Sequence, residues 1–339
     1  MTMFRKAAMP SASAGGRGYS ILERNNLERF LDSVTPCLPL HSVPRSHIHG
    51  MDNNWLPVGD EPVPYFQLAD LWHGFDKASA YGVGSRVLFD NGDVVTQYYS
   101  PFLSAIQLFT GTPYASARCN SDISWSDDNE SEKVSRSTSN DDSSPTWEVH
   151  SNGTAENNSS LSSDKRGHPY LSYSEFASPF WRVPLYDKVL ELAQTRPELM
   201  TLKSVELSPS SWMAVLWYPV YNIPSQRRSK DLSTIFLTFY TLSSSFLDNQ
   251  AIIEREDKVR VPKKSLQQRK SKAAGKKMIC LRPFGLSSFK MCGNTWTQTE
   301  SDLEKISSLQ SAADSWLKQL GFFHHDFSFY LTHPSEVHK

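Results

Sequence analysis

The stretch that decides the fold is WMAVLWYPVY at residues 212–221, followed after a polar break by TIFLTFYTL at residues 234–242. Both are rich in aromatic and β-branched residues, and neither has a polar face. A strand that is apolar on both faces is covered on both sides. We therefore expect two central strands of one sheet. Pro219 has no amide hydrogen, so it is expected at a strand end or edge.

Helices are predicted on both sides of these strands in the chain. Residues 67–81 place apolar side chains at helical spacing, and a second helix begins after Pro184, with Val189, Leu190 and Ala193 facing inward. A helix near the start of the chain is expected to be capped by Asn26 and stopped by Pro36.

The last predicted helix starts at a capping box of Ser301 and Glu304 and ends at Gly321. Hairpins are expected around Asn91-Gly92 and around residues 283–285, which would pair 278–282 with 286–291. The strand signal over 97–109 is expected to break at Ser100-Pro101. Hairpin-like strands with helices outside them predict an α+β fold with a mostly antiparallel sheet and flanking helices.

Two polar inserts interrupt this pattern, and their charges are opposite. Residues 120–164 contain 14 Ser and a net charge of −8, whereas residues 254–277 have a net charge of +7. Such segments bury too little apolar surface to offset the entropy of ordering them. We predict one α+β domain over 19–335, with a disordered N-terminus at 1–18, a disordered acidic insert at 120–166 and a disordered basic insert at 249–277.

The cysteines and apolar runs indicate the environment of the chain. The chain has four widely spaced cysteines and no CxxC motif: Cys37, Cys119, Cys280 and Cys292. This spacing argues against a disulfide framework and against a zinc site, and it fits a reducing compartment. No apolar run approaches 18 residues, so membrane insertion is not expected. The N-terminus has the Arg, Ala and Ser content of a transit peptide, but its Gly and Pro residues interrupt the amphipathic helix that such a peptide forms. We therefore expect the protein in the cytoplasm or the nucleus and not in an organelle.

No catalytic residues and no cofactor are predicted, because the chain has no phosphate loop, nucleophile elbow or complete dinucleotide fingerprint. The weak candidates for metal ligands are His47, His49 and Asp52, although the acid comes one position late for an HxHxD pattern. The run His324-His325-Asp326 follows the last helix. Adjacent side chains of an extended segment point apart, so this run is a poor chelator.

The tryptophans fall into two groups. Those in or beside predicted elements are expected to pack in the core: Trp55, Trp72, Trp181, Trp212, Trp217, Trp296 and Trp316. Trp125 and Trp147 lie in the acidic insert, where an isolated aromatic is typical of a linear motif. Ser124, Ser126 and Ser139 have acidic residues just after them, so they are candidate phosphorylation sites.

Paired basic residues in the second insert are candidates for a nuclear import signal or polyanion contact: Lys263, Lys264, Arg269, Lys270, Lys276 and Lys277. The insert has no aromatic residues for base stacking, which weakens an expectation of specific nucleic-acid binding.

Several stretches together resemble a plant family catalogued as domain of unknown function 789. They are NNLERFLDSVTP (25–36), NNWLPVGDEPVPYFQLADLWHGFDKASAYGVG (53–84), VVTQYYSPFLSAIQL (94–108), LSPSSWMAVLWYPVYNIP (207–224), STIFLTFYTLSS (233–244) and RPFGLSSFKMCGNTW (282–296). The resemblance implies a soluble plant protein without an established reaction or ligand, and it supplies no catalytic residues.

The sequence therefore favours a non-enzymatic interaction or regulatory protein that binds protein partners of unknown identity. Two alternatives stay open. One is a metal-dependent or other enzyme with a pocket near residues 41–60, and the other is a nuclear factor that contacts nucleic acid through the basic insert.

Overall fold

The computed structural model describes residues 25–48, 55, 61–113, 166–220, 231–247, 252–255, 276–291 and 293–333. The fold is α+β, and each strand pairing among these residues is antiparallel, as the sequence predicts. The main sheet has six strands in the order β11-β8-β7-β5-β4, with β6 paired to β5. They are β4 (Val83–Leu88), β5 (Val94–Thr110), β6 (His168–Ser174), β7 (Trp212–Pro219), β8 (Ile235–Thr241) and β11 (Gly285–Phe289).

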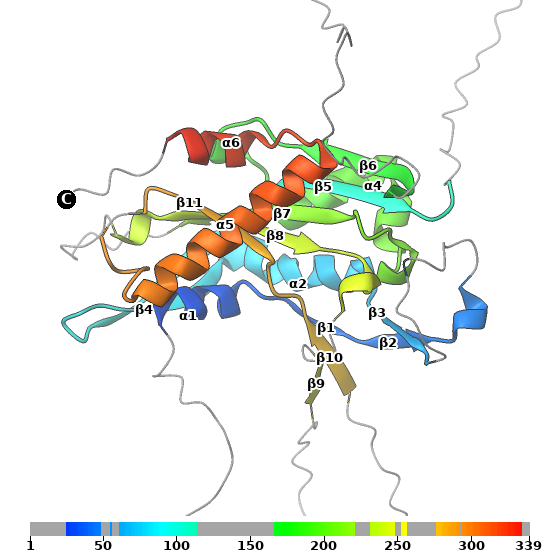
Figure 1. Cartoon of the computed structure of the whole chain (residues 1–339), viewed down its shortest axis with the longest axis horizontal. Coiled ribbons are helices and arrows are strands. Elements are labelled where there is room, and N and C mark those ends of the chain that lie inside the picture. Colours follow the sequence, from blue (N-terminus) through cyan, green and yellow to red (C-terminus); the bar gives the residue numbers. More distant parts are fainter. Residues whose placement is uncertain are drawn as a thin grey trace, which may run out of the picture.

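The two faces of this sheet are covered by different helices (Figure 1). One face packs against α1 (Asn26–Ser33), α2 (Leu68–Tyr81) and α4 (Leu185–Thr195). The other packs against α5 (Glu300–Leu320) and α6 (His325–Thr332). Along β7, Met213, Val215 and Trp217 point to the first face, and Trp212, Ala214 and Leu216 point to the second. Cover on both sides explains why β7 has no polar face.

A ring cluster at the centre of the core joins distant parts of the chain. Phe30 of α1 stacks on Phe236 of β8 with ring centroids 4.0 Å apart. Trp296, just before α5, meets Phe236 edge-on at 5.1 Å, and Tyr99 of β5 meets Phe30 at 5.2 Å. The parts of the chain before, between and after the two polar inserts thus contribute to one core.

The long strand β5 corrects the expected break at Ser100-Pro101. It runs unbroken through Pro101 and has a register shift between Leu103 and Ala105. On the edge away from β7, β4 pairs only as far as Tyr99 and β6 pairs from Ala105 onward. Proline is tolerated here because neither strand pairs with the residues between.

Helix ends lie close to the predicted positions, but two caps are shifted. Asn25, not Asn26, caps α1 by accepting the Glu28 amide, while the Asn26 side chain bonds the backbone of Leu88. The capping box of α5 is Thr299 with Asp302 instead of Ser301 with Glu304. The predicted end at Gly321 is confirmed. In α4, Val189 is buried as predicted, whereas Leu190 is exposed.

A separate three-stranded sheet has the order β1-β10-β9, from β1 (Cys37–Pro39), β9 (Ile252–Arg255) and β10 (Lys276–Cys280). The expected hairpin around residues 283–285 is therefore wrong, because β10 pairs with β1 and β9 while β11 pairs with β8. The basic insert predicted to be disordered over 249–277 accordingly has strands at both of its ends.

A disulfide joins Cys37 and Cys280, which lie opposite each other in the β1–β10 ladder. This bond corrects the expectation drawn from the wide spacing of the cysteines, because residues 243 positions apart meet in the fold. Cys119 and Cys292 lie outside the described residues.

The remaining elements are short. A two-stranded sheet pairs β2 (His41–Val43) with β3 (Val63–Tyr65). The 3-10 helices are η1 (Arg45–His47), η3 (Pro179–Trp181), η4 (Pro197–Met200), η5 (Ser204–Glu206), η6 (Asp231–Ser233) and η7 (Ser244–Phe246). Within the described ranges, no helix combines the length and the apolar character needed to cross a membrane.

Candidate functional site

The most distinctive surface feature is the connection between β6 and α4, residues 175–183, which we call the aromatic loop. It contains η3 and displays three large aromatic side chains to solvent. Phe176, Phe180 and Trp181 are 63, 77 and 84 % exposed. Apolar groups gathered on one exposed segment are typical of an interaction site, whereas scattered single ones are not.

Trp181 corrects the expectation that tryptophans beside predicted elements pack in the core. Trp72, Trp212, Trp217 and Trp296 are buried as predicted. Trp181 instead points outward from η3, and its neighbour Phe180 meets Tyr218 at the end of β7 with ring centroids 5.4 Å apart. The aromatic surface therefore extends from the loop to the sheet.

The first end of the aromatic loop is held by Glu175. Its carboxylate accepts the backbone amides of Phe176 at 3.0 Å and Ala177 at 2.9 Å. The other carboxylate oxygen accepts the hydroxyl of Tyr173 at 2.5 Å. The Glu175 amide in turn donates to the carbonyl of Ser104 on β5 at 2.9 Å. These bonds fix the backbone where it leaves β6.

The second end is held by a buried ion pair. Arg182 donates two hydrogen bonds to the carboxylate of Asp326, each 2.7 Å long, and its Nε donates to the carbonyl of Ala177 at 2.9 Å. Asp326 lies in the first turn of α6. A bidentate contact between a guanidinium and a carboxylate fixes the relative orientation of the two groups as well as their distance. Arg182 thus joins the two ends of the loop to each other and fastens the loop to α6.

Ser104 and His324 complete the buried polar cluster below the loop. The Ser104 hydroxyl donates to Asp326, and its oxygen lies 3.4 Å from Nε2 of His324. Nδ1 of His324 accepts the amide of Phe327 at 3.2 Å and so caps α6. All four side chains are buried. Each has a partner inside the cluster, as buried polar groups require.

Although it contains Ser, His and Asp, this cluster does not have the geometry of a catalytic triad. In a triad the histidine accepts the serine proton and the aspartate orients the histidine. Here Nδ1 of His324 accepts a backbone amide, which places the ring proton on Nε2, and Ser104 donates to Asp326. His324 therefore has no free nitrogen to act as a base toward Ser104.

Burial and charge set the protonation of the cluster. Burial lowers the pKa of His324 to about 4, which keeps the imidazole neutral. Burial alone would raise the pKa of Asp326, but the hydrogen bonds and charge of Arg182 and the bond from Ser104 bring it below its usual value. The cluster is thus one charged pair joined to two neutral side chains near neutral pH.

A pocket of about 330 Å³ lies beside this cluster, where α5 turns into α6. Its walls include Leu317, Lys318, Phe323, His324, Phe327 and Leu331. Lys318 is paired with Asp314 at 2.7 Å, and both ring nitrogens of His324 already have partners. Asp314 and Ser328 also line the pocket, so its walls are partly apolar and partly polar.

A family model described as "Protein of unknown function (DUF789)" matches residues 25–330. The chain belongs to this family. The matched region includes the whole aromatic loop, both partners of the buried ion pair and the first six of the eight residues of α6. No curated protein and no solved structure matches the chain. The family's description names no reaction.

The predicted metal ligands do not form a described site. His47 ends η1 and is exposed, whereas His49 and Asp52 lie outside the described residues. In the described part of the chain, no three His, Cys, Asp or Glu side chains gather in a way that would hold a metal ion. The metal-site hypothesis around residues 41–60 stays a prediction.

The other predicted sites fall largely in parts of the DUF789 protein that the structure does not describe. These are Ser124, Ser126, Ser139, Trp125, Trp147, Lys263, Lys264, Arg269 and Lys270. Lys276 and Lys277 belong to β10, where they pair in register with Arg255 and Glu254 of β9. These two lysines therefore belong to an ordered ladder.

Sequence reasoning missed the aromatic loop and its anchor. Arg182 and Asp326 are 144 positions apart, and no local pattern links them. One signal was present: Phe176, Phe180 and Trp181 keep no sustained helical or strand period, and Pro184 separates them from the next helix. Aromatic residues without a period have no core face to occupy.

Proposed function

We propose that this DUF789 protein is a non-enzymatic interaction protein that inserts its aromatic loop into an apolar cleft on a partner protein. The observation that carries the proposal is the exposure of Phe176, Phe180 and Trp181 on a loop fastened at both ends. Large aromatic residues dominate the binding energy of many protein interfaces.

The anchors of the loop favour tight binding. A partner that covers an exposed aromatic side chain gains about 25 cal/mol per Å² of apolar surface removed from water. Ordering a flexible loop would offset part of this gain. Because Glu175 and the Arg182–Asp326 pair already hold the backbone, little ordering remains to be done on binding.

The charges around the loop favour a protein over a lipid surface or a nucleic acid. Arg182 is buried in its pair with Asp326, and Lys188 is paired with Glu191. Asp187 is exposed in the first turn of α4. Anionic membranes and phosphate backbones are bound through unpaired lysine and arginine side chains. An apolar protein cleft needs no such cations.

The non-enzymatic part of the proposal is supported by the hydrogen bonds of the buried cluster. Ser104, His324 and Asp326 satisfy one another and the backbone, and none of them turns a free atom toward the pocket. Their role in the proposal is to position the loop.

The acidic and basic inserts supply the regulatory part of the proposal. Their net charges of −8 and +7 on one body favour contact between them, and phosphorylation of Ser124, Ser126 or Ser139 would strengthen it. Trp125 and Trp147 are the motif candidates for further partners, and Lys263–Lys277 is the import candidate. A cytoplasmic or nuclear location and a plant origin belong to the same proposal.

The test compares three forms of the full chain: wild type, Phe180→Ser/Trp181→Ser and Leu303→Ser. Leu303 is 55 % exposed near the start of α5, about 25 Å along the helix from the end next to α6. Substitutions of exposed side chains leave the free energy of unfolding within about 0.5 kcal/mol. Denaturant titration confirms that all three forms fold before they are used for affinity capture.

The expected result is a partner protein that wild type and Leu303→Ser retain and that Phe180→Ser/Trp181→Ser loses. Purified partner is then titrated against each form to measure the loss in affinity, which we expect to be at least tenfold. Equal binding by all three forms contradicts the proposal. If the wild type instead binds phosphatidylcholine vesicles and the double variant does not, the loop binds a membrane and the proposal is wrong. If the wild type self-associates and the double variant does not, the loop binds a second copy of the chain and the proposal is also wrong.

A further inference from the structure

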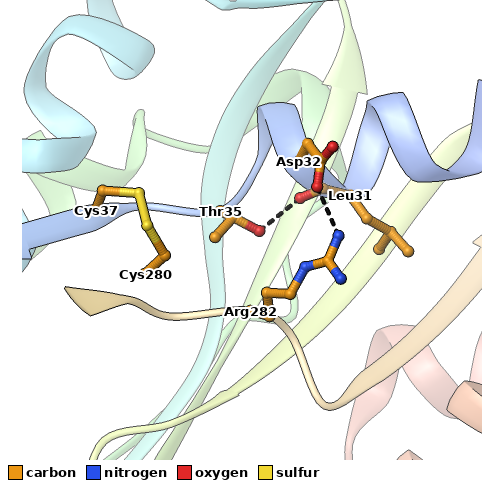
Figure 2. The surroundings of a disulfide bond; sticks show 6 residues. All are labelled: Leu31, Asp32, Thr35, Cys37, Cys280 and Arg282. Carbon is orange, nitrogen blue, oxygen red and sulfur yellow. Dashed lines mark hydrogen bonds and ion pairs between the residues drawn. A yellow bond between two sulfur atoms is a disulfide. The ribbon is translucent and has the colours of Figure 1, made fainter. Parts of the chain in front are cut away.

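The disulfide between Cys37 and Cys280 lies at the edge of the small sheet, away from the aromatic loop. β1 is the edge strand of the order β1-β10-β9, so a thiol approaches without displacing a neighbouring strand. Figure 2 shows the bond beside the C-terminal end of α1, next to Arg282 and Asp32. Cys37 is exposed and Cys280 is half-buried. Attack by an external thiolate requires such access to a sulfur atom.

The two cysteines stay opposite each other without the bond. The Leu281 amide donates to the carbonyl of Pro36, and the Leu40 amide donates to the carbonyl of Lys277, both at 2.9 Å. Leu38 and Ile279, the next pair in the ladder, are both buried. These contacts flank the cysteines on both sides. A reduced pair therefore remains positioned to form the bond again.

Arg282 adds a non-covalent clamp on the same segment. Its guanidinium bonds Asp32 at 2.5 Å and Glu28 at 3.1 Å, both on α1 (Figure 2 for Asp32). This contact ties the chain just after Cys280 to the body. Reduction is therefore expected to loosen β10 locally without releasing β11 or the main sheet.

We propose that Cys37 and Cys280 form a reversible redox site that exchanges with cellular dithiols and that its reduction loosens the attachment of β10, and with it β9, to β1. β9 pairs with β10 from Ile252 to Arg255, and β10 is joined to the body through β1. The bond thus determines whether the chain that follows the 256–275 segment, in which Lys263-Lys264 and Arg269-Lys270 lie, is covalently fastened to β1. Accessible disulfides that can re-form are typically labile or regulatory.

The exchange is balanced in both directions. One thiolate of a thioredoxin-type dithiol attacks one cysteine sulfur, forms a mixed disulfide and releases the other cysteine as a thiolate that takes up a proton. The second thiol of the reductant then displaces the remaining cysteine. The protein gains two electrons and two protons, and the reductant becomes a disulfide. Oxidised glutathione reverses the reaction through the same type of intermediate.

The experiment equilibrates the full-length protein with glutathione buffers of graded ratio and with reduced thioredoxin. Free thiols are trapped by alkylation and mapped by peptide mass spectrometry. We expect Cys37 and Cys280 to become reactive together while denaturant titration shows that the main sheet is still folded. A pair that stays oxidised until global unfolding contradicts the proposal, as does a bond that maps to Cys119 or Cys292.

Hydrogen exchange of both states tests the structural consequence. On reduction, amides of Met278, Ile279 and Cys280 are expected to exchange at least about tenfold faster, while amides of β7 keep their rates. Cys37→Ser/Cys280→Ser should match the reduced form, and Cys292→Ser should match the oxidised form under oxidising conditions. Equal exchange of β10 in both states of the wild type overturns the proposal even if the double variant fails to fold.

Discussion

At the scale of single residues, the Arg182–Asp326 pair determines the position of the aromatic loop. Both side chains are almost fully buried, at 1 and 7 % exposure. Removing two charges from water is costly, and their mutual attraction with good hydrogen bonding offsets that cost. The pair therefore contributes little net stability as a unit. The loss of one partner alone is expensive because the other charge stays buried.

Asp326→Leu should lower the free energy of unfolding by about 3–5 kcal/mol, because it leaves the Arg182 guanidinium buried without a counter-charge. The double change Arg182→Met/Asp326→Leu should recover much of that loss, since an apolar pair replaces the charges. Denaturant titration of the wild type and the two variants measures both values. A double variant as unstable as Asp326→Leu would show that the hydrogen bond from Ser104 or the helix contact, and not the charge, governs the cost.

His324 should make stability depend on pH. Its pKa is lowered to about 4 in the folded protein, whereas an unfolded histidine titrates near 6.5. Between these values the unfolded chain binds a proton that the folded chain does not. The free energy of unfolding should therefore fall as the pH drops from about 6.5 to 4, by up to about 1.4 kcal/mol per unit. The pKa of Asp326 is lowered from 3.8 in the folded protein, so its contribution to the free energy of unfolding is lost only at pH values below this window.

The matched variant for this prediction is His324→Asn. Asparagine is a good N-cap, so its side chain is expected to accept the Phe327 amide that His324 now accepts, and it cannot titrate. Denaturant titrations at several pH values should give a flatter pH dependence for the variant than for the wild type. Parallel curves would show that protonation of His324 does not lower the free energy of unfolding.

At the scale of elements, α5 and β11 pack unusually closely. A Cβ atom on Gly285 would lie 2.9 Å from Cβ of Ala313 and 3.3 Å from its Cα. Both residues are buried in the interface between helix and sheet. Small residues at both positions allow α5 to lie across β11 and bring α6 to the end of the sheet (Figure 1). Helix α6, which carries Asp326, follows α5 directly in the chain.

Gly285→Ala should lower the free energy of unfolding by about 1–3 kcal/mol, because the new methyl group forces the helix and the strand apart. Ala313→Gly costs about 1 kcal/mol through helix propensity. The two changes together should cost less than the sum of the single changes, since glycine at 313 removes the nearest atom. Additive losses in a double-mutant cycle would show that the backbone of α5, and not the Ala313 methyl group, sets the limit.

At the scale of the whole molecule, one core is assembled from three separated stretches of sequence. β5 from the first stretch pairs with β7 from the second, and Trp296 from the third packs on Phe236 of β8. Folding therefore requires contacts between residues more than 100 positions apart. Such contacts hold the stretches together whether or not the chain between them is intact.

Composition predicts that proteases cut first within 120–164 and 256–275. The nicked protein should elute as one particle in size-exclusion chromatography and separate into fragments only in denaturant, because the sheet and the ring cluster join all three stretches. Reducing agent alone should not separate the fragments. Early cleavage inside β5, β7 or β8, or separation of the fragments in native buffer, would contradict the single-core arrangement.

Much of the fold was predictable because local patterns report burial. The apolar runs of β7 and β8 predicted strands covered on both faces, and Asn91-Gly92 predicted the turn between β4 and β5. The range of α2 followed from the spacing of apolar residues, and the start of α4 followed from Pro184. Caps were missed by a residue or two, because neighbouring Asn, Ser and Thr residues compete for the same role.

Other features were decided by tertiary structure alone. The partners of β10, the bond between Cys37 and Cys280 and the pair of Arg182 with Asp326 all join residues far apart in the chain. A residue's pattern shows whether it is buried or extended but not which distant residue lies opposite it. Trp181 shows a related limit, because its position beside a predicted element indicated burial although its side chain is exposed. Its ring is exposed beside an ion pair that fastens the loop to α6, and that pair exists only once β5, α6 and the loop have come together.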